Sequence, residues 1–479
     1  MKKLDMKSKN LINKKIADLA ELFPGSITEL DGETVVDYDF LKQELSDRII
    51  DSTVERYQLN WPGKKESLIL SNTPINKTLR PLINESKNFD TTLNLFIEGE
   101  NLDALKLLQE TYLKKIKLIY IDPPYNTGRN LIYKNDFNQN ISDFLETSNQ
   151  SDENGNNLVS NLETNGRFHS DWLSMIYPRL RLAKNLLADD GLLFCTIDEN
   201  EQATLSLVLK EVFAESGYEH TCVTIVHNPR GQQGTNVSYV HEYGFIVYPA
   251  DKKKYISDFK KDEVDARTLR DSGTQSDRTD AKNCFYPFLV KNNKIISIGN
   301  VPDDTFHPKN ANEILEDGSM LIWPITDDGD EKKWRYARQS VDEILDKLEV
   351  KDGRNASQII FNKDEETMRS VWNKSKYDAS EYGTKLLEKL VSGASFTYPK
   401  SLWAVYDAIY AATKDCKDAI VLDFFAGSAT TAHATMQLNA NDGGNRRFIM
   451  VQIPQEVENQ YKNEKFKFNT ISDISKERF

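Results

Sequence analysis

The chain has 479 residues, of which 39% are hydrophobic and 28% charged, and its formal net charge is −13. This size allows a large core and roughly two to three domains, while the negative charge argues against a non-specific polyanion binder, because phosphate contacts depend on Lys and Arg. The sequence has no run of about 18 apolar residues, and its basic, amphipathic start lacks the apolar centre of a signal peptide. We therefore expect a cytoplasmic protein without a membrane segment.

The first segment, residues 1–90, is polar and is expected to form an N-terminal helical extension. Its apolar residues follow the spacing of one amphipathic helix, at Leu11, Ile12, Ile16, Leu19 and Leu22. We interpret this segment as peripheral to the catalytic core.

Residues 91–250 alternate between strand and helix patterns, which is typical of a parallel sheet covered by helices. We expect strands at 93–99, 117–121, 192–198, 221–227 and 243–248, and helices at 100–113, 170–191 and 201–213. Residues 138–166 are rich in Asn, Ser, Asp and Glu and predict a flexible loop or cover that follows Tyr125.

Residues 251–385 interrupt the alternation. They are charged, contain short mixed elements and carry aromatic residues such as Trp323 and Trp334, so we expect a separate inserted domain. The alternation returns over 386–479, with helices at 401–413 and 428–440 and strands at 419–423 and 447–453. Neither α/β portion has enough strands alone, so we expect the two portions to complete one sheet.

The sequence VLDFFAGSATTAHA contains a strand that ends in Asp423, a turn through Gly427 and a helix from about Ser428. This pattern is how a doubly wound sheet binds a nucleotide-like ligand at the carboxyl ends of its strands. A tight turn without a ligand would look similar. The motif is neither the dinucleotide fingerprint, since G-x-G-x-x-G is absent, nor a P-loop, since no G-K-[ST] follows.

The sequence IYIDPPYNTG places polar chemistry at the end of an apolar strand. Asp122 can accept hydrogen bonds from an amine and stabilise positive charge on it. Pro123 and Pro124 fix the backbone and leave carbonyl groups as acceptors, while Tyr125 offers a flat face for a planar ring. The motif therefore predicts a clamp for a planar amine.

Both motifs resemble those of AdoMet-dependent amino-methyltransferases: IYIDPPYNTG resembles the D-P-P-Y motif, and DFFAGSATTAHA the F-x-G-x-G cofactor motif. Their order, with the insertion between them, is similar to the circularly permuted beta class of DNA adenine methyltransferases. Further phrases, such as RYQLNWPGKKESL, LFIEGENLDALKLLQE and GGNRRFIMVQIPQE, resemble the Mod subunits of type III restriction-modification systems. The resemblance implies an α/β fold with a Rossmann-like methyltransferase sheet, an inserted target-recognition domain and a helical N-terminal extension.

The resemblance implies that Asp122 and the carbonyl of Pro123 hold the exocyclic amine of an adenine flipped out of double-stranded DNA, with Tyr125 stacked on its ring. The amine would take a methyl group directly from S-adenosyl-L-methionine (AdoMet), without a covalent nucleophile or a metal. The residues implied in AdoMet binding are Asp423, Phe425, Ala426, Gly427, Ser428, Pro399, Lys400, Glu100, Asn101 and Glu456. Ala429 departs from the glycine of the family pattern, and Gln455 stands where the ribose-binding acid is expected, one residue before Glu456.

The insertion would read base edges in the major groove. Its candidate DNA contacts are Arg267, Arg270, Arg335 and Arg338, although surface salt bridges would explain the same residues. The implied partners are double-stranded DNA and the Res subunit, an ATP-dependent endonuclease. A homodimer is expected if the chain includes the C-terminal portion of the family, which the ending ISDISKERF lacks.

Other functions stay open at this point. One is a truncated, catalytically inactive recognition subunit that guides a partner endonuclease. Methylation of cytosine is disfavoured because that family usually carries Ser where this chain has Asp122. Methylation of RNA or of protein glutamine uses related proline-aromatic motifs, but the central insertion and the Mod-like phrases disfavour both.

Overall fold

The computed structural model describes residues 11–22, 26–30, 33–36, 59–127, 168–233, 236–394, 396–457 and 468–479. The expected covering loop at 138–166 lies outside the described residues. The chain divides into two compact units, the first formed by Met1–Ser257 and Arg369–Phe479, and the second by Asp258–Met368. No helix among the described residues is long and apolar enough to cross a membrane.

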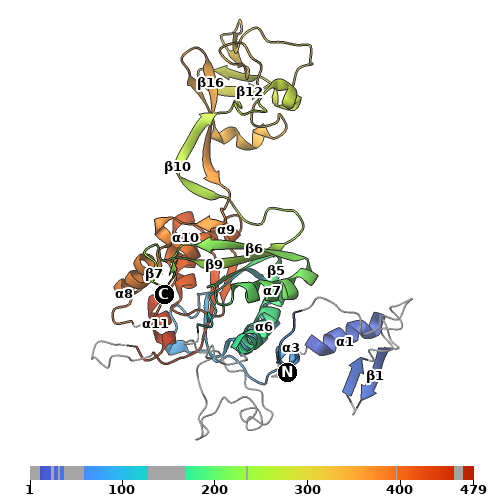
Figure 1. Cartoon of the computed structure of the whole chain (residues 1–479), viewed down its shortest axis with the longest axis vertical. Helices are drawn as coiled ribbons and strands as arrows, with labels where there is room; N and C mark the ends of the chain where they lie inside the picture. The colour runs from blue at the N-terminus through green and yellow to red at the C-terminus, as the bar shows by residue number, and fades with distance from the viewer. Residues whose placement is uncertain are drawn as a thin grey trace. The chain divides into compact units, whose positions relative to one another are not determined.

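The first unit is built on an eight-stranded sheet with the order β17-β6-β9-β5-β4-β18-β19-β3 (Figure 1). In this order the strands are Val371–Trp372, Tyr218–Ile225, Glu242–Pro249, Leu187–Ile197, Ile116–Ile121, Ile420–Asp423, Arg447–Gln452 and Leu95–Glu98. All neighbours are parallel except that β9 runs antiparallel to β5 and β6. Since β18 and β19 lie between β4 and β3, the two α/β portions complete one sheet, as predicted.

Helices cover both faces of this sheet. One group contains α3 (Lys64–Asn72), α4 (Asn101–Tyr112), α6 (Phe168–Leu186) and α7 (Gln202–Phe213), and the other contains α9 (Leu402–Thr413) and α10 (Thr430–Asp442). Alternate residues of β19 show the two faces: Ile449 and Val451 pack into the core with the first group, whereas Phe448 and Met450 pack with α10. The sheet is therefore doubly wound, and its buried strands are apolar on both sides.

Helix α6 ends at Leu186 and not near Gly191, where the sequence pattern predicted its end. The carbonyl groups of Asn185 and Leu186 accept hydrogen bonds from the backbone of Lys114 and Lys115, at 3.1 and 3.0 Å. This contact draws the chain into pairing with β4, so β5 begins at once.

The N-terminal segment is less uniformly helical than predicted. Besides α1 (Leu11–Leu22), it contains the antiparallel pair β1 (Ile27–Leu30) and β2 (Glu33–Val36). From residue 59 onward the chain joins the main core, where the Trp61 indole donates to Ser174 Oγ of α6 at 3.1 Å. Thus α3 belongs with the helices that cover the sheet.

The second unit contains only short sheets within its described residues. The four-stranded sheet joins β12 (Lys294–Ile298), β11 (Phe288–Lys291), β14 (Met320–Ile322) and β13 (Asn312–Ile314), and the three-stranded sheet joins β10 (Phe259–Thr268), β16 (Ser357–Glu366) and β15 (Leu348–Asp352). Trp334, Tyr286 and Phe288 form the centre of its core. This unit ends at Met368 and not at the predicted residue 385, because β17 pairs with β6 of the first unit.

Shorter elements complete the first unit. They are β7 (Gln232–Gln233), β8 (Ser238–Tyr239), α8 (Lys385–Leu390) and α11 (Ile471–Arg478). Helix α11 begins with a capping box, in which Thr470 and Asp473 bond each other's backbone N–H groups.

Candidate active site

The two sequence motifs meet at one edge of the sheet. Strands β4 and β18 are parallel neighbours, so Asp122 after β4 and Asp423 at the end of β18 lie at the same, carboxyl-terminal edge. The chain leaves β4 toward α6 and leaves β18 toward α10, which covers the opposite face. Such a reversal of crossover direction opens a crevice and is the usual ligand position in doubly wound sheets.

Asp122 is the more accessible of the two carboxylates, with 28% of its side chain exposed. Thr196 at the end of β5 donates its hydroxyl to Asp122 Oδ1 at 2.7 Å, and Lys400 Nζ lies 3.2 Å from the same oxygen. Both groups use Oδ1. The second carboxylate oxygen is therefore the one best placed to accept a substrate amine.

Lys400 links Asp122 to a second, deeply buried carboxylate. Its ammonium group contacts Glu242 Oε2 and donates to the Tyr125 hydroxyl. The Tyr125 hydroxyl in turn donates to Glu242 Oε2 at 2.9 Å, and Lys400 Nζ lies 4.6 Å from the centre of the tyrosine ring. The cation thus fixes both the position of Asp122 and the orientation of the Tyr125 ring.

These contacts favour the charged forms of Glu242 and Lys400. Burial alone would favour neutral forms, but the charge of Lys400 outweighs it and lowers the pKa of Glu242. Burial likewise opposes the charge on Lys400, yet Asp122 and Glu242 raise its pKa. Burial, with the two carboxylates, raises the pKa of Tyr125 well above its usual value. The tyrosine therefore stays a neutral hydrogen-bond donor.

The Pro123–Pro124 turn is held by a hydrogen bond from helix α6. The Trp172 indole of α6 donates to the Pro124 carbonyl at 2.7 Å. The Pro124 carbonyl therefore already accepts one hydrogen bond, and the roles of the two proline carbonyls toward a ligand stay predictions. Asn126 follows with a φ of +61° and donates to the buried Glu201 carboxylate at 2.6 Å, which fixes the exit of the turn.

The cofactor loop after β18 is organised by hydrogen bonds around Asp423, which is only 3% exposed. Its carboxylate accepts from the Phe425 backbone N–H at 2.9 Å and from the Thr431 hydroxyl at 2.6 Å. Burial raises the pKa of Asp423 to about 7, although these two bonds oppose the shift. Gly427 N–H donates to Gln452 Oε1 at 2.7 Å, which ties the loop to the end of β19.

Side chains of helix α11 also bond to this loop. Ser475 Oγ donates to the Gly427 carbonyl, and the Arg478 guanidinium donates to Ser428 Oγ at 2.8 Å and to Thr430 Oγ1 at 2.8 Å. Arg478 is buried, and burial lowers its pKa to about 10.

Two residues of the loop have positive φ. Gly427, at +51°, has no side chain, and a Cβ there would lie 3.2 Å from the Phe396 ring. Ala429, at +59°, adopts the left-handed conformation despite its methyl group and is fully buried. Ala429 therefore has a backbone conformation that glycine adopts more readily.

Glu100 and Asn101 are tied to the cofactor loop through an arginine. Arg179 of α6 donates to the carboxylate of Glu100 and to the amide oxygen of Asn101, while Asn101 Nδ2 donates to the Phe424 carbonyl at 2.8 Å. Glu100 also caps α4 by accepting from the backbone of Asp103 at 3.1 Å. This network supports the predicted position of both residues beside the loop.

The remaining cofactor candidates, Pro399, Lys400 and Glu456, are not part of this hydrogen-bond network. Pro399 is buried, and its carbonyl oxygen lies where a Cβ on Gly383 would have to go. Lys400 lies beside the turn after β4, in contact with Asp122. Glu456 is exposed and its backbone forms an isolated bridge with Thr470. Its assignment to the ribose stays a prediction.

Two arginines of the second unit hold the unit's own structure. Arg338 donates to the Gly299 carbonyl at 2.8 Å and to Asp342 at 2.9 Å. Arg335 pairs with Asp271 at 3.0 Å. Each therefore has a structural role, and a role in DNA contact stays a prediction.

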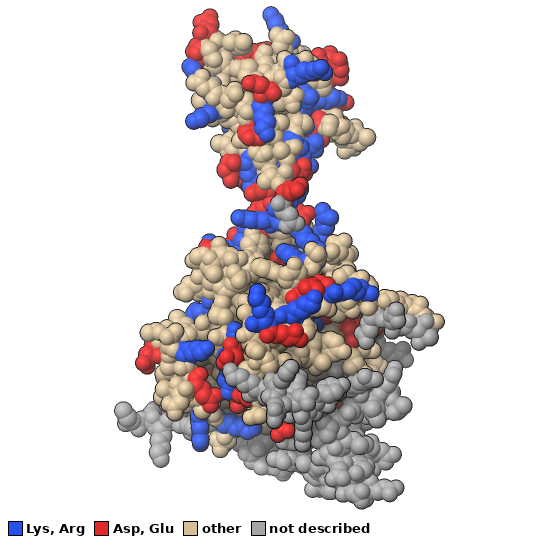
Figure 2. All heavy atoms as spheres, turned by 90° about the vertical axis from the view of Figure 1, so that its left-hand side faces the viewer, with Lys and Arg blue, Asp and Glu red and all other residues tan. Residues whose placement is uncertain are grey.

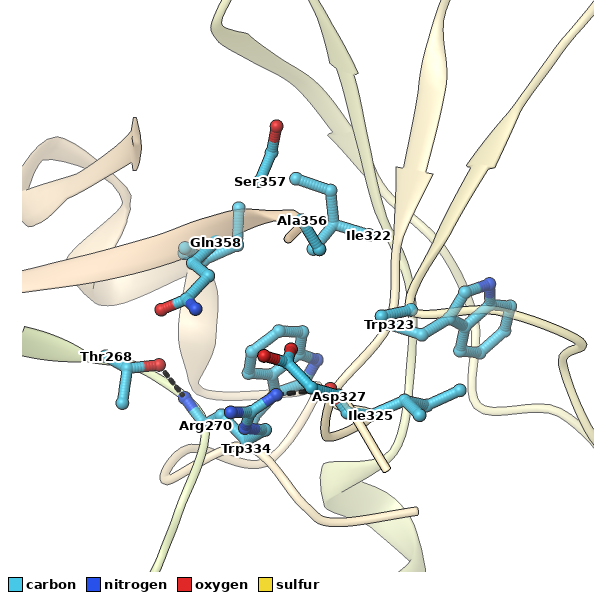
Figure 3. Close-up of a pocket in the computed structure, with 12 residues that line it drawn as sticks. Thr268, Arg270, Ile322, Trp323, Ile325, Asp327, Trp334, Ala356, Ser357 and Gln358 are labelled. Atoms are coloured by element: carbon cyan, nitrogen blue, oxygen red, sulfur yellow. Dashed lines mark hydrogen bonds between the residues drawn. The ribbon is translucent and has the colours of Figure 1, made fainter. Parts of the chain in front are cut away.

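Of the other two arginines, Arg270 lines a pocket of the same unit (Figure 3). Arg270 donates to the Ile325 carbonyl, and its backbone N–H donates to Thr268 Oγ1 at 3.2 Å. Arg267 lies over the Phe361 ring at 5.8 Å. On the face seen in Figure 2, acidic and basic side chains are intermixed over this unit, as the mixed-charge sequence suggests.

Sequence reasoning missed three residues of the corner and its support: Glu242, Thr196 and Arg179. A carboxylate at the start of an otherwise apolar strand was the available signal for Glu242, because charge is rarely buried without a partner. Thr196 and Arg179 carried no comparable signal.

Several features of the loop Asp423–Ser428 are compatible with AdoMet binding. Gly427 keeps the turn free of a side chain where the loop passes Phe396, and the buried Asp423 orders the loop backbone from beneath. Glu100, Asn101 and Arg179 place further polar groups beside the same turn.

Comparisons with known proteins agree with this arrangement. A family model described as DNA methylase matches residues 116–463. The Mod subunit of the type III restriction-modification enzyme EcoPI from Escherichia phage P1 is 30% identical over 474 residues, which cover 92% of this chain and 70% of that protein. The StyLTI Mod subunit of Salmonella typhimurium is 30% identical, with coverage of 96% and 68%.

A further relative, the type II methyltransferase M.KpnI of Klebsiella pneumoniae, is 30% identical over 435 residues, which cover 86% of this chain and 92% of that protein. The family model covers well over half of the chain, and the EcoPI subunit matches over more than two thirds of its own length. The chain therefore belongs to the DNA methylase family, with the Mod subunits of type III restriction-modification enzymes.

Proposed function

We propose that this chain is a site-specific DNA methyltransferase that transfers a methyl group from AdoMet to N6 of an adenine flipped out of double-stranded DNA. The observation that carries the proposal is the juxtaposition of the Asp122 corner and the Asp423 loop at one edge of the sheet. A clamp for a planar amine and a loop fitted to AdoMet thus adjoin each other.

Each residue of the corner has a distinct task. Asp122 accepts a hydrogen bond from the adenine amine through Oδ2, because Thr196 and Lys400 already engage Oδ1. The Pro123 carbonyl accepts the second amine hydrogen. Tyr125, held by its hydroxyl, would stack its ring on the base.

AdoMet, when bound, supplies the electrophilic methyl group. Asp423, Phe425, Ala426, Gly427 and Ser428 would hold it, with Glu100 and Asn101 at the side of the loop. The chain's own contribution is to fix the amine and to stabilise the positive charge that develops on it, without a covalent step on the protein.

Within a restriction-modification system we propose that the chain is the modification and specificity subunit. The second unit, Asp258–Met368, would read the site, and a Res endonuclease and a second copy of the chain would be its partners. A second candidate is a methyltransferase that acts without an endonuclease, which the match to 92% of the type II enzyme M.KpnI favours.

The test is sequencing of modified bases in DNA from a methylation-free host that expresses this chain. We expect N6-methyladenine on one strand of a short asymmetric site. Methylcytosine would overturn the assignment of the base, and unmodified DNA from cells with soluble, AdoMet-binding protein would favour a recognition subunit that does not methylate. Co-purification with a Res subunit would separate the type III role from the stand-alone role.

A further inference from the structure

Three charged groups, Asp122, Lys400 and Glu242, meet beside Tyr125. Of these, Glu242 is not among the site residues that the sequence predicted. Glu242 is 2% exposed, and its Oε2 contacts Lys400 Nζ and accepts from the Tyr125 hydroxyl. Lys400 in turn lies 3.2 Å from Asp122 Oδ1. Glu242 does not itself contact Asp122 in the described structure, so its effect on a substrate amine must act through its two partners.

The net charge of these three groups determines the electrostatic environment of the substrate amine. Asp122 and Glu242 contribute two negative charges and Lys400 one positive charge, so the group carries a net charge of minus one. Without Glu242, the cation would pair with Asp122 alone and the net charge would be zero. Because the corner is largely shielded from water, one unit of charge has a large effect there.

This balance matters during methyl transfer. The amine nitrogen forms a bond to carbon with its lone pair, while the bond between that carbon and sulfur breaks and its electron pair stays on sulfur. The nitrogen then carries a positive charge until one of its protons leaves to water. A site with net negative charge stabilises this nitrogen, whereas a neutral ion pair does so far less.

We propose that Glu242 is a positioning residue for methyl transfer: it offsets the charge of Lys400, so that the cluster of Asp122, Lys400 and Glu242 has a net negative charge beside the substrate amine, and it holds Tyr125 for stacking. Lys400 is then a structural cation that requires Glu242. This inference rests on the proposed function and adds a residue to its site.

The experiment measures single-turnover methyl transfer from tritiated AdoMet to site-containing DNA at saturating concentrations of both. Glu242→Gln keeps the shape and removes the charge, and we expect the rate to fall by at least about 10-fold. The dissociation constant for AdoMet, measured by calorimetry, should change less than about threefold, since the described side-chain contacts of Glu242 are with Lys400 and Tyr125 and not with the loop Asp423–Ser428.

A double variant separates charge balance from loss of structure. Glu242→Gln with Lys400→Met restores a net charge of minus one, and we expect it to be faster than Glu242→Gln alone by at least about threefold. Glu242→Asp, which keeps the charge, should also exceed Glu242→Gln. An equal or lower rate in the double variant would overturn the charge-balance argument.

The chain provides a matched control in Asp407 of α9. This carboxylate is 4% exposed and has the same kinds of partner: Lys376 Nζ at 2.7 Å and the Tyr377 hydroxyl at 2.6 Å. It makes no contact with Asp122. Asp407→Asn should therefore lower the melting temperature about as much as Glu242→Gln while the rate of methyl transfer is retained.

The outcomes separate the two proposals. If the wild-type protein transfers no methyl group to DNA, the proposed function fails. If the wild type is active and Glu242→Gln is equally fast, the proposed function stands and the role of Glu242 is wrong. If Asp407→Asn is as slow as Glu242→Gln, the loss follows from instability, and the positioning role is also wrong.

Discussion

The turns that follow β4 and β18 lie at the same edge of the sheet, yet they hold their carboxylates in opposite ways. Asp122 is partly exposed and is paired with a cation, whereas Asp423 is buried and is held by an N–H group and a hydroxyl. The pKa of Asp423 accordingly rises to about 7 through burial. The first carboxylate is paired with a cation at a partly exposed position, and the second uses hydrogen bonds to shape a loop.

The largest effect is expected from removal of the Asp122 carboxylate, the first of the two compared. Asp122→Ala removes the acceptor for the amine, so the rate of methyl transfer should fall by at least about 1,000-fold. Binding of AdoMet, measured by calorimetry, should stay near the wild-type value because the cofactor loop is untouched. Turnover at the wild-type rate would contradict the assigned role of Asp122.

The second prediction concerns the pH dependence that Asp423 gives to stability. The folded-state pKa of about 7 exceeds the ordinary value of 3.8, so the folded protein binds the proton more tightly between these values. The free energy of unfolding should therefore fall as pH rises from about 4 to 7, by up to about 4 kcal/mol from this group. Urea titrations of wild type and Asp423→Asn across this range measure the difference, and parallel pH profiles would refute the prediction.

The third prediction addresses the shape of the loop. Gly427→Asp adds a side chain at a φ of +51°, beside the Phe396 ring, and brings a second carboxylate near Asp423. We expect AdoMet affinity to fall by at least about 30-fold, a loss of about 2 kcal/mol. An unaltered dissociation constant in calorimetry would show that the loop does not hold the cofactor.

The smallest effect is expected at Ala429, which has a positive φ like Gly427 but carries a methyl group. Ala429→Gly relieves about 1–2 kcal/mol of left-handed strain, but it loses a buried methyl group and loosens the unfolded chain by comparable amounts. Thermal unfolding should therefore shift by no more than about 1 kcal/mol in stability, and AdoMet affinity should be retained. A large change would mean that the methyl group itself shapes the cofactor site.

The local patterns predicted the fold because strands and helices follow residue spacing along the chain. The strands at 117–121 and 447–453 and the helix at 401–413 match β4, β19 and α9 within one residue. The two α/β portions on either side of the insertion could be assigned to one sheet, because neither portion has enough strands to form a complete sheet alone. The boundary at 385 was wrong because β17 has only two residues, too few to show a strand pattern.

The site was predictable only in part for a related reason. Asp122, Tyr125 and Gly427 stand in local motifs, where strand, turn and chemistry are read together. Glu242 joins the corner across more than a hundred residues, and its partner Lys400 comes from yet another segment. Spacing along the chain carries no information about such pairs until the order of the strands is known.

The inserted unit is joined to the methyltransferase unit by two chain connections. Before the insertion the Ser257 backbone bonds Ala411 of α9, and after it the chain returns as β17, whose Trp372 carbonyl accepts from Val226. None of the strand pairs around Asp122 or Asp423 includes a residue of Asp258–Met368. If Asp258–Met368 reads the DNA site, as proposed, exchange of this segment between related chains would alter which site is modified and preserve the chemistry, and new specificities would arise by recombination at its two junctions.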